Sequence, residues 1–305
     1  MNSPAFPTTH QWTWRGHRVR YQTLGDRGSA VILIHGFGAS GDHWRHNLAA
    51  LATQHRVYAL DLMGFGFSDK PNPQSFSYTF ETWADQVLDF CEAVVQAPVH
   101  LIGNSIGCIV ALQAAVQDPH RCHSLSLLDC SLRLLHERKR PTLPWYQQIS
   151  TPIFQRVLGL PPVGQFFFSQ VARPGAIANF LRQAYHNSAA VTQDLVEYIY
   201  RPALEPGAAA VFLSFIQYSH GPLAEDLLPQ VRCPVLILWG AEDPWEPLAL
   251  GQDLAQFDCV EDFIALPGVG HCPQDEAPDQ VNPILLQWLD RQTPQLHNHK
   301  HKLTL

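Results

Sequence analysis

The stretch Gly103-Asn104-Ser105-Ile106-Gly107 constrains the fold of this chain more than any other. A largely apolar run that begins at Val99 leads into it, and an Ala- and Leu-rich run from Ile109 to Gln117 follows it. A Gly-x-Ser-x-Gly turn between a strand and a helix holds its serine in a strained backbone conformation and exposes the hydroxyl above the sheet. A chain with 19 glycines can also contain this pattern by chance. The flanking strand and helix favour Ser105 as a nucleophile.

Short runs of strand type alternate with segments of helical spacing along much of the chain. The expected strands are His10–Arg15, His17–Gln22, Val31–Ile34, Val57–Leu60, the run from Val99, Leu125–Leu128, Val235–Trp239 and Asp262–Leu266. The expected helices are Asp42–Thr53, Thr79–Gln96, Ile109–Gln117 and Val281–Leu289. This alternation predicts an α/β fold with a mostly parallel, eight-stranded sheet that is flanked by helices on both faces.

The alternation stops between Asp129 and Arg232, where about 100 residues show helical spacing and no strand pattern. We therefore expect residues 1–129 and 231–295 to form the core and residues 130–230 to form an inserted helical cap. Residues 296–305 are expected to be a flexible tail.

Composition and charge exclude several classes of protein. The 305 residues are 46% hydrophobic, which is enough for a large core, but no run approaches 18 apolar residues and no signal-peptide pattern begins the chain. We therefore expect a cytoplasmic protein or one peripheral to a membrane. Seven cysteines without a Cys-x-x-Cys pair predict reduced thiols rather than a disulfide framework or a zinc site. We expect no metal and no cofactor. A net charge of −7 and scattered basic residues argue against nucleic-acid binding.

A serine nucleophile needs a base, and the base needs an acid to orient it. His271 lies in a glycine-rich loop after the last expected strand, and Asp243 follows the preceding strand. Along the chain the order is Ser105, Asp243, His271. This is the order of a catalytic triad whose nucleophile lies at a turn between a strand and a helix. Glu242 and Asp129 remain alternatives for the acid, because each also lies at or near the end of an expected strand.

The expected reaction also requires two backbone N–H groups that bind the negative oxygen of the tetrahedral intermediate. We expect one from Ile106, directly after the nucleophile, and one from Phe37 in the His35-Gly36-Phe37-Gly38 loop. His35 is expected to brace this loop rather than act as a second base, and the glycine-punctuated loop of residues 61–69 is expected to be scaffold. A serine at the elbow favours acyl transfer over chemistry that uses an aspartate nucleophile.

Together, His35-Gly36-Phe37-Gly38, Gly103 to Gly107, Asp243 and His271 resemble the α/β-hydrolases. The finer resemblance is to the pheophytinases and chlorophyll dephytylases of plants and cyanobacteria. It is carried by Gly103 to Gly107 and by two narrower stretches, Glu242-Asp243-Pro244-Trp245 and Gly270-His271-Cys272-Pro273. The chain starts without the plastid transit segment of the plant enzymes, which suggests a bacterial source, such as a cyanobacterium.

This resemblance implies hydrolysis of the phytyl ester of chlorophyll or pheophytin through an acyl-enzyme, with a location in the cytoplasm or at the thylakoid membrane. A general esterase, a carbon–carbon bond hydrolase of the same fold and a non-catalytic pigment-binding protein remain alternatives.

The cap is rich in aromatic residues that could line a site for a large apolar ester. Aromatic residues at helical spacing are equally typical of the core of a cap. The segment Ser131 to His220 has eight basic and four acidic residues, so it is compatible with contact with an anionic membrane or with a solvated surface. The candidate substrate-binding residues are Trp145, Phe154, Phe166, Phe167 and Trp245.

Overall fold

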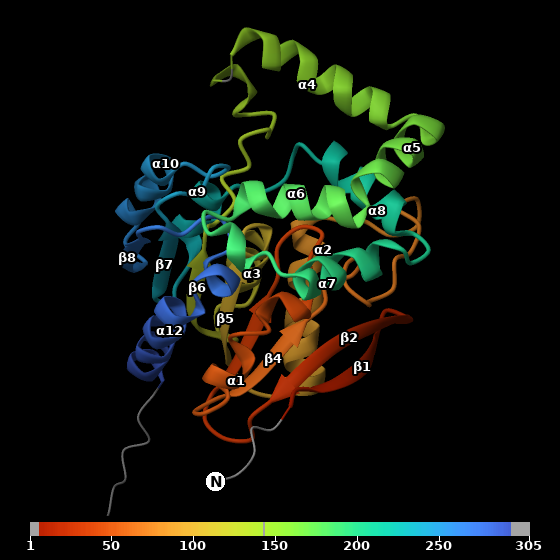
Figure 1. The fold of residues 1–305 in the computed structure, drawn as a ribbon. Helices are drawn as coiled ribbons and strands as arrows, with labels where there is room; N and C mark the ends of the chain where they lie inside the picture. Colours follow the sequence, from red (N-terminus) through yellow and green to blue (C-terminus); the bar gives the residue numbers. More distant parts are fainter. Residues whose placement is uncertain (1–5, 143, 294–305) are drawn as a thin grey trace, which may run out of the picture.

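The computed structural model describes residues 6–142 and 144–293, and it contains one eight-stranded sheet in the order β1-β2-β4-β3-β5-β6-β7-β8 (Figure 1). β1 pairs antiparallel with β2 and β2 antiparallel with β4, whereas every other neighbouring pair is parallel. The predicted α/β fold with a mostly parallel, eight-stranded sheet is therefore confirmed. The strands are β1 Thr8–Trp14, β2 His17–Leu24, β3 Ala30–Ile34, β4 Arg56–Leu60, β5 Val99–Asn104, β6 Cys122–Leu128, β7 Val235–Gly240 and β8 Val260–Leu266.

Helices cover both faces of the sheet, which explains why the central strands are largely apolar. Every residue of β3, β5 and β7 is buried. The core on one face includes α2 (Phe80–Phe90) and α3 (Ile106–Gln117), and the core on the other includes α1 (Leu48–Leu51) and α12 (Pro278–Gln292). The remaining short helices of this body are η1 Gly41–Trp44, η2 Cys91–Val95, α10 Leu248–Gln252, η6 Asp253–Gln256 and α11 Pro273–Glu276.

The expected helix from Asp42 to Thr53 is wrong. The chain instead forms a 3₁₀ turn, η1, and a separate short helix, α1. The carboxylate of Asp42 is bound by the guanidinium of Arg20, with both N–O distances 2.8 Å, and by the amide of Gln22 at 2.9 Å. These contacts with β2 fix the first turn against the sheet, and a sequence period cannot reveal them.

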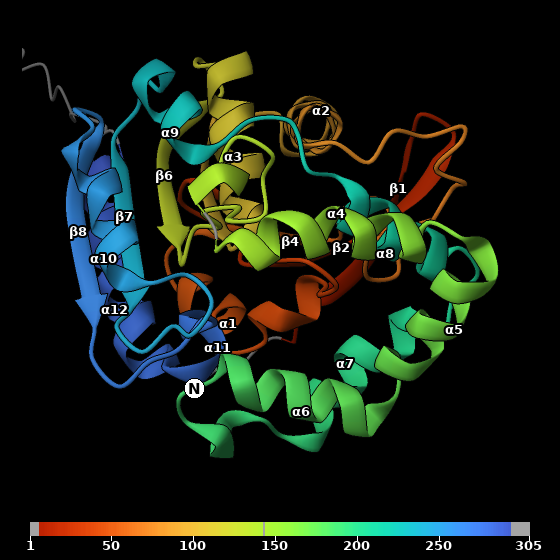
Figure 2. The same ribbon diagram turned by 90° about the horizontal axis from the view of Figure 1, so that it is seen from above.

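The segment between β6 and β7 is helical, and no strand occurs in its described residues. Figures 1 and 2 show its helices over the edge of the sheet at which the parallel strands end. The buried side chains of α6 and α7 include Ile177, Leu181 and Leu195, which form a small core of their own. The elements of this segment are η3 Arg140–Thr142, α4 Trp145–Leu158, α5 Pro161–Val171, α6 Pro174–Ala184, η4 Ser188–Ala190, α7 Gln193–Ala203, α8 Ala208–Gln217, α9 Ala224–Leu227 and η5 Leu228–Gln230.

The cap boundaries at 129/130 and 230/231 remain a prediction. The expected tail, residues 296–305, lies outside the described residues. Among the helices of the described part, none is both long and apolar enough to cross a membrane.

Candidate active site

Ser105 lies at a sharp turn between β5 and α3. Its φ of 55° and ψ of −120° are strained values for a residue with a side chain. The turn is tight because glycines allow the backbones to meet: a Cβ at Gly107 would lie 2.3 Å from the carbonyl oxygen of Ile34, and one at Gly103 would lie 2.5 Å from the Gly107 backbone. The Ser105 N–H donates to the carbonyl of Leu128 in β6, at 3.0 Å, and this bond holds the turn against the sheet.

His271 and Asp243 come from the loops after β8 and β7, and the structure brings them together. Nδ1 of His271 lies 2.7 Å from Oδ2 of Asp243, with both side chains buried. The other oxygen of Asp243 accepts hydrogen bonds from the backbone N–H groups of Trp245 and Glu246. Burial raises the pKa of Asp243, but the hydrogen bond from His271 and the backbone N–H bonds outweigh burial, and the pKa is lowered. An ionised Asp243 keeps the proton of His271 on Nδ1 and leaves Nε2 free to act as a base.

Two further acids lie close to this pair. Asp129 directly follows β6 and is fully buried. It accepts a hydrogen bond from the Gly240 N–H at 2.9 Å, whereas its Oδ2 has no partner among the described residues. Burial and the neighbouring Asp243 raise the pKa of Asp129 well above its usual range. Burial also raises the pKa of Glu246 to about 7. Glu242 is exposed. Of the three acids weighed from the sequence, only Asp243 bonds to the imidazole.

Asp129, Asp243 and His271 also offer ligand atoms that all lie within 4.8 Å of one another. A metal ion there would compete with the short hydrogen bond between Asp243 and His271, and burial disfavours the charged form of Asp129 that would bind it. The arrangement therefore fits proton transfer better than metal binding.

The hydrogen bonds of the described residues do not include one between the Ser105 hydroxyl and Nε2 of His271. Such bonds often close only when substrate is present. Asn104 joins the two loops instead: its amide nitrogen donates to the backbone carbonyls of Leu128 and His271, both at 3.1 Å. The sequence pattern did not identify this role of Asn104, because it depends on a loop 167 residues away.

The two predicted oxyanion donors border the serine. The loop after β3 touches the elbow, since a Cβ at Gly36 would lie 3.3 Å from the Cβ of Ser105. Neither the N–H of Phe37 nor that of Ile106 donates a hydrogen bond to another described residue. Ile106 begins α3, and N–H groups in the first turn of a helix point outward in a field that favours negative charge. Both groups are therefore available to an oxyanion.

His35 and the loop of residues 61–69 have structural contacts. Nε2 of His35 accepts the N–H of Leu62 at 3.0 Å, so Nδ1 carries the proton and donates to the carbonyl of Gly36 at 2.8 Å. Burial lowers the pKa of His35, which keeps the ring neutral. The carboxylate of Asp61 accepts the N–H groups of Gly41 and Phe67. These contacts hold the loop that carries Phe37.

Aromatic rings surround the serine and histidine loops. Phe37 stacks on Phe215 with ring centres 4.8 Å apart and lies 5.1 Å from Phe212, both on α8. The ring of Trp245 lies 4.9 Å from that of His271 and 4.6 Å from that of Phe180. Sequence reasoning missed Phe212 and Phe215, although their spacing of three residues in a helical segment places both on one face.

The other candidate substrate-binding residues occupy the outer part of the cap. Phe154 is 50% exposed and contacts Phe167 edge-on, and Phe166 is 67% exposed. The side chain of Trp145 lies outside the described part. Of the five candidates, only Trp245 has a described ring contact with a predicted catalytic residue.

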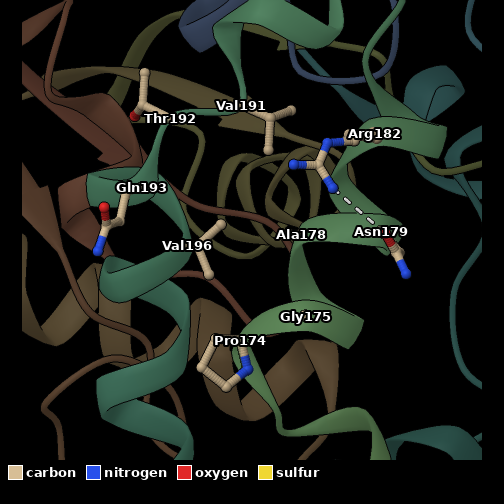
Figure 3. Close-up of a pocket in the computed structure, with 9 residues that line it drawn as sticks. All are labelled: Pro174, Gly175, Ala178, Asn179, Arg182, Val191, Thr192, Gln193 and Val196. Atoms are coloured by element: carbon tan, nitrogen blue, oxygen red, sulfur yellow. Dashed lines mark hydrogen bonds between the residues drawn. The ribbon is translucent and has the colours of Figure 1, made fainter.

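A separate pocket of about 430 Å³ lies between α6 and α7 (Figure 3). Apolar groups of Pro174, Ala178, Val191 and Val196 line it, and Arg182 on its rim donates to Asn179. It contains none of the residues proposed for the reaction.

Comparisons with known proteins show the family and the fold of the chain. Residues 31–284 match the family described as "Alpha/beta hydrolase family". The chain is 26% identical to the chloroplastic pheophytinase of Arabidopsis thaliana over 89% of its length, and it spans 64% of that protein. It is also 26% identical to the uncharacterized hydrolase YugF of Bacillus subtilis (strain 168), over 89% of this chain and 94% of that one. The solved structure of the epoxide hydrolase CorEH, 23% identical, has the same fold with a TM-score of 0.76, covering 94% of this chain and 99% of that one.

Proposed function

Because this chain belongs to the alpha/beta hydrolase family, we propose that it is a serine hydrolase that cleaves carboxylic esters. The observation that carries this proposal is the 2.7 Å contact between Nδ1 of His271 and Oδ2 of Asp243, in a structure that also holds Ser105 at a strained elbow. An aspartate at the elbow would indicate chemistry through an alkyl-enzyme ester. A serine there indicates an acyl-enzyme.

In the first half of the proposed reaction, the hydroxyl oxygen of Ser105 attacks the ester carbonyl and Nε2 of His271 takes the hydroxyl proton. Asp243 stabilises the imidazolium that forms. The N–H groups of Phe37 and Ile106 bind the oxyanion. The C–O bond to the alcohol then breaks, and His271 gives the proton to the leaving oxygen.

In the second half, His271 removes a proton from water, and the resulting hydroxide attacks the acyl-serine. Collapse of the second tetrahedral intermediate releases the carboxylic acid, and His271 returns the proton to Ser105. Asp243 is held at both oxygens throughout, by His271 on one side and by two backbone N–H groups on the other.

We further propose that the ester is the phytyl ester of a chlorophyll-type pigment. Two observations support this substrate. The first is the similarity to a protein named pheophytinase over 89% of the chain. The second is the apolar shell of Phe37, Phe212, Phe215 and Trp245, which suits a large apolar molecule better than a small polar one.

The test is to incubate the purified chain with chlorophyll a, pheophytin a and bacteriochlorophyll a, and to measure phytol and de-esterified pigment for each. Short p-nitrophenyl esters are assayed in parallel, and the Ser105→Ala variant is the control. Phytol release that depends on Ser105 supports the full proposal. A strong preference for the small esters would indicate a general esterase, and pigment binding without phytol release would indicate a non-catalytic binding protein.

A further inference from the structure

The helices α4 and α5 form an arm at the end of the molecule farthest from the sheet (Figure 1). More than half of the large hydrophobic side chains that the described residues expose lie in this short part of the chain. They are Tyr146, Ile153, Phe154, Val157, Leu160, Val163 and Phe166. A soluble monomer rarely exposes so continuous an apolar surface without a use for it.

The inner side of the arm is already occupied. Gln155 donates from its side chain to the carbonyl of Ile216 in α8 at 2.9 Å, and Leu158 is buried. Gly164 of α5 faces α8 as well, because a Cβ there would lie 2.7 Å from the side chain of Leu213. Gln155, Leu158 and Gly164 therefore define the side that faces the protein.

Three of the exposed side chains, Ile153, Val157 and Phe166, lie on the opposite side. With 3.6 residues per turn, Ile153 and Val157 are about half a turn around α4 from Gln155, and Phe166 is about half a turn around α5 from Gly164. Ile153 is 56% exposed and Val157 is 43% exposed. The arm thus has an apolar face that is turned away from α8, against which both of its helices pack.

Charge distinguishes the candidate partners of this face. Residues 141–193 include Arg156, Arg173 and Arg182 and no aspartate or glutamate, although the whole chain has a net charge of −7. All three arginines are exposed, and none forms an ion pair with a described residue. Arg156 lies beside the apolar face of α4, about a quarter turn from Gln155. Its long side chain could therefore reach a lipid headgroup while its neighbours enter the acyl region.

We infer that the outer face of α4 and α5 docks on an anionic phospholipid bilayer. An apolar helix face with Arg156 beside it has the chemistry of an interfacial helix, which buries its apolar side and binds headgroups with its basic side chains. A second copy of the chain fits less well, since a self-complementary contact through this face would bring like charges together. This inference rests on the proposed function. A phytylated pigment resides in a membrane, so it must reach Ser105 from there.

Vesicle co-sedimentation tests this inference. The full chain is mixed with vesicles of phosphatidylcholine alone or of phosphatidylcholine with phosphatidylglycerol. Binding only to the anionic vesicles, and weaker binding at higher salt, are expected. Ile153→Ser combined with Val157→Ser should weaken binding by at least about tenfold, since two exposed apolar side chains no longer enter the bilayer. Arg156→Gln should weaken it about fivefold. Leu204→Ser, which changes an equally exposed side chain outside the arm, is the matched control and should bind as the parent does.

Two further measurements separate this inference from the proposed function. The Ser105→Ala variant should bind vesicles as the parent does, and the arm variants should hydrolyse a short soluble ester at the parental rate. Size-exclusion chromatography with light scattering reports the oligomeric state. No binding by the parent, binding that the arm variants leave unchanged, or a parental dimer that the arm variants dissociate would each overturn the inference.

Discussion

The side-chain amide of Asn104 donates a hydrogen bond to the backbone carbonyl of His271 at 3.1 Å and thereby ties the nucleophile turn to the histidine loop. The same nitrogen donates to the carbonyl of Leu128. Asn104, the residue directly before Ser105, therefore fixes the position of His271, the proposed base. The relative position of Ser105 and His271 depends on this contact more than on any direct bond between them.

Replacement of Asn104 by Ala should lower kcat on a soluble ester by about tenfold and leave KM nearly unchanged, because the base is misplaced while the substrate site is intact. The two carbonyls also lose a buried donor, so the free energy of unfolding should fall by about 1–3 kcal/mol. Steady-state kinetics below the unfolding transition and thermal unfolding measure both effects. Asn179→Ala, on the exposed side of α6, is the control and should change neither. An unchanged kcat in Asn104→Ala would show that the His271 loop is positioned without it.

Asp243 and Asp129 should differ sharply when each is changed to Asn. Asp243→Asn removes the charge that orients His271 and should lower kcat on the order of 10⁴-fold. Asp129 has a raised pKa and no described hydrogen bond to His271, so Asp129→Asn should lower kcat by less than about tenfold. Measuring kcat of both variants at pH 7 shows which of the two acids orients His271. A larger loss in Asp129→Asn than in Asp243→Asn would identify Asp129 as the acid of the triad.

Glu246 should make stability depend on pH. Burial raises its pKa to about 7 from 4.5, so between those values the folded state binds more protons than the unfolded state and stability falls as pH rises. The loss across this window is about 3 kcal/mol. Chemical denaturation at pH 5 and pH 8 should therefore show a smaller decrease for Glu246→Gln than for the parent. Gln keeps an acceptor for the Ser131 hydroxyl, which donates to Glu246 at 3.0 Å. The exposed Glu242→Gln serves as control, and equal decreases in Glu246→Gln and the parent would contradict the assignment.

Two glycine substitutions should act in opposite directions. Gly107→Ala places a Cβ 2.3 Å from the carbonyl of Ile34 in a buried strand, and we expect it to prevent folding or to unfold well below the parental melting temperature. Gly175 in α6 has open space around it, so Gly175→Ala should raise the free energy of unfolding by about 0.5–1 kcal/mol. Thermal unfolding followed by circular dichroism measures both. A Gly107→Ala variant with parental stability would mean that β3 and the elbow are farther apart than described.

Much of the fold could be predicted because its signals are local. The central parallel strands are short, largely apolar runs, and every residue of β3, β5 and β7 is buried because both faces are covered. The helix expected from Asp42 to Thr53 failed because Arg20 and Gln22, on a strand far back in the chain, bind the side chain of Asp42. Contacts of that kind have no period in the sequence.

Some residues of the candidate site could likewise be predicted from local sequence, and others could not. Ser105, Asp243 and His271 follow recognisable strand ends, so chain order alone suggested them. Asn104 and the rings of Phe212 and Phe215 acquire their positions from loops and cap helices that are distant in sequence. Phe154 and Phe166 are candidates by residue type alone, and residue type does not reveal which side of a helix faces the protein.

The most direct test of the proposed mechanism is to treat the folded chain with a serine-directed fluorophosphonate and to locate the adduct by peptide mass spectrometry. A nucleophile activated by His271 should be labelled stoichiometrically at Ser105. Labelling should be absent in Ser105→Ala and strongly slowed in His271→Ala, while both variants retain the parental circular dichroism spectrum. A folded parental chain that takes up no label at Ser105, or that labels equally well without His271, would contradict the assignment of this protein as a serine hydrolase.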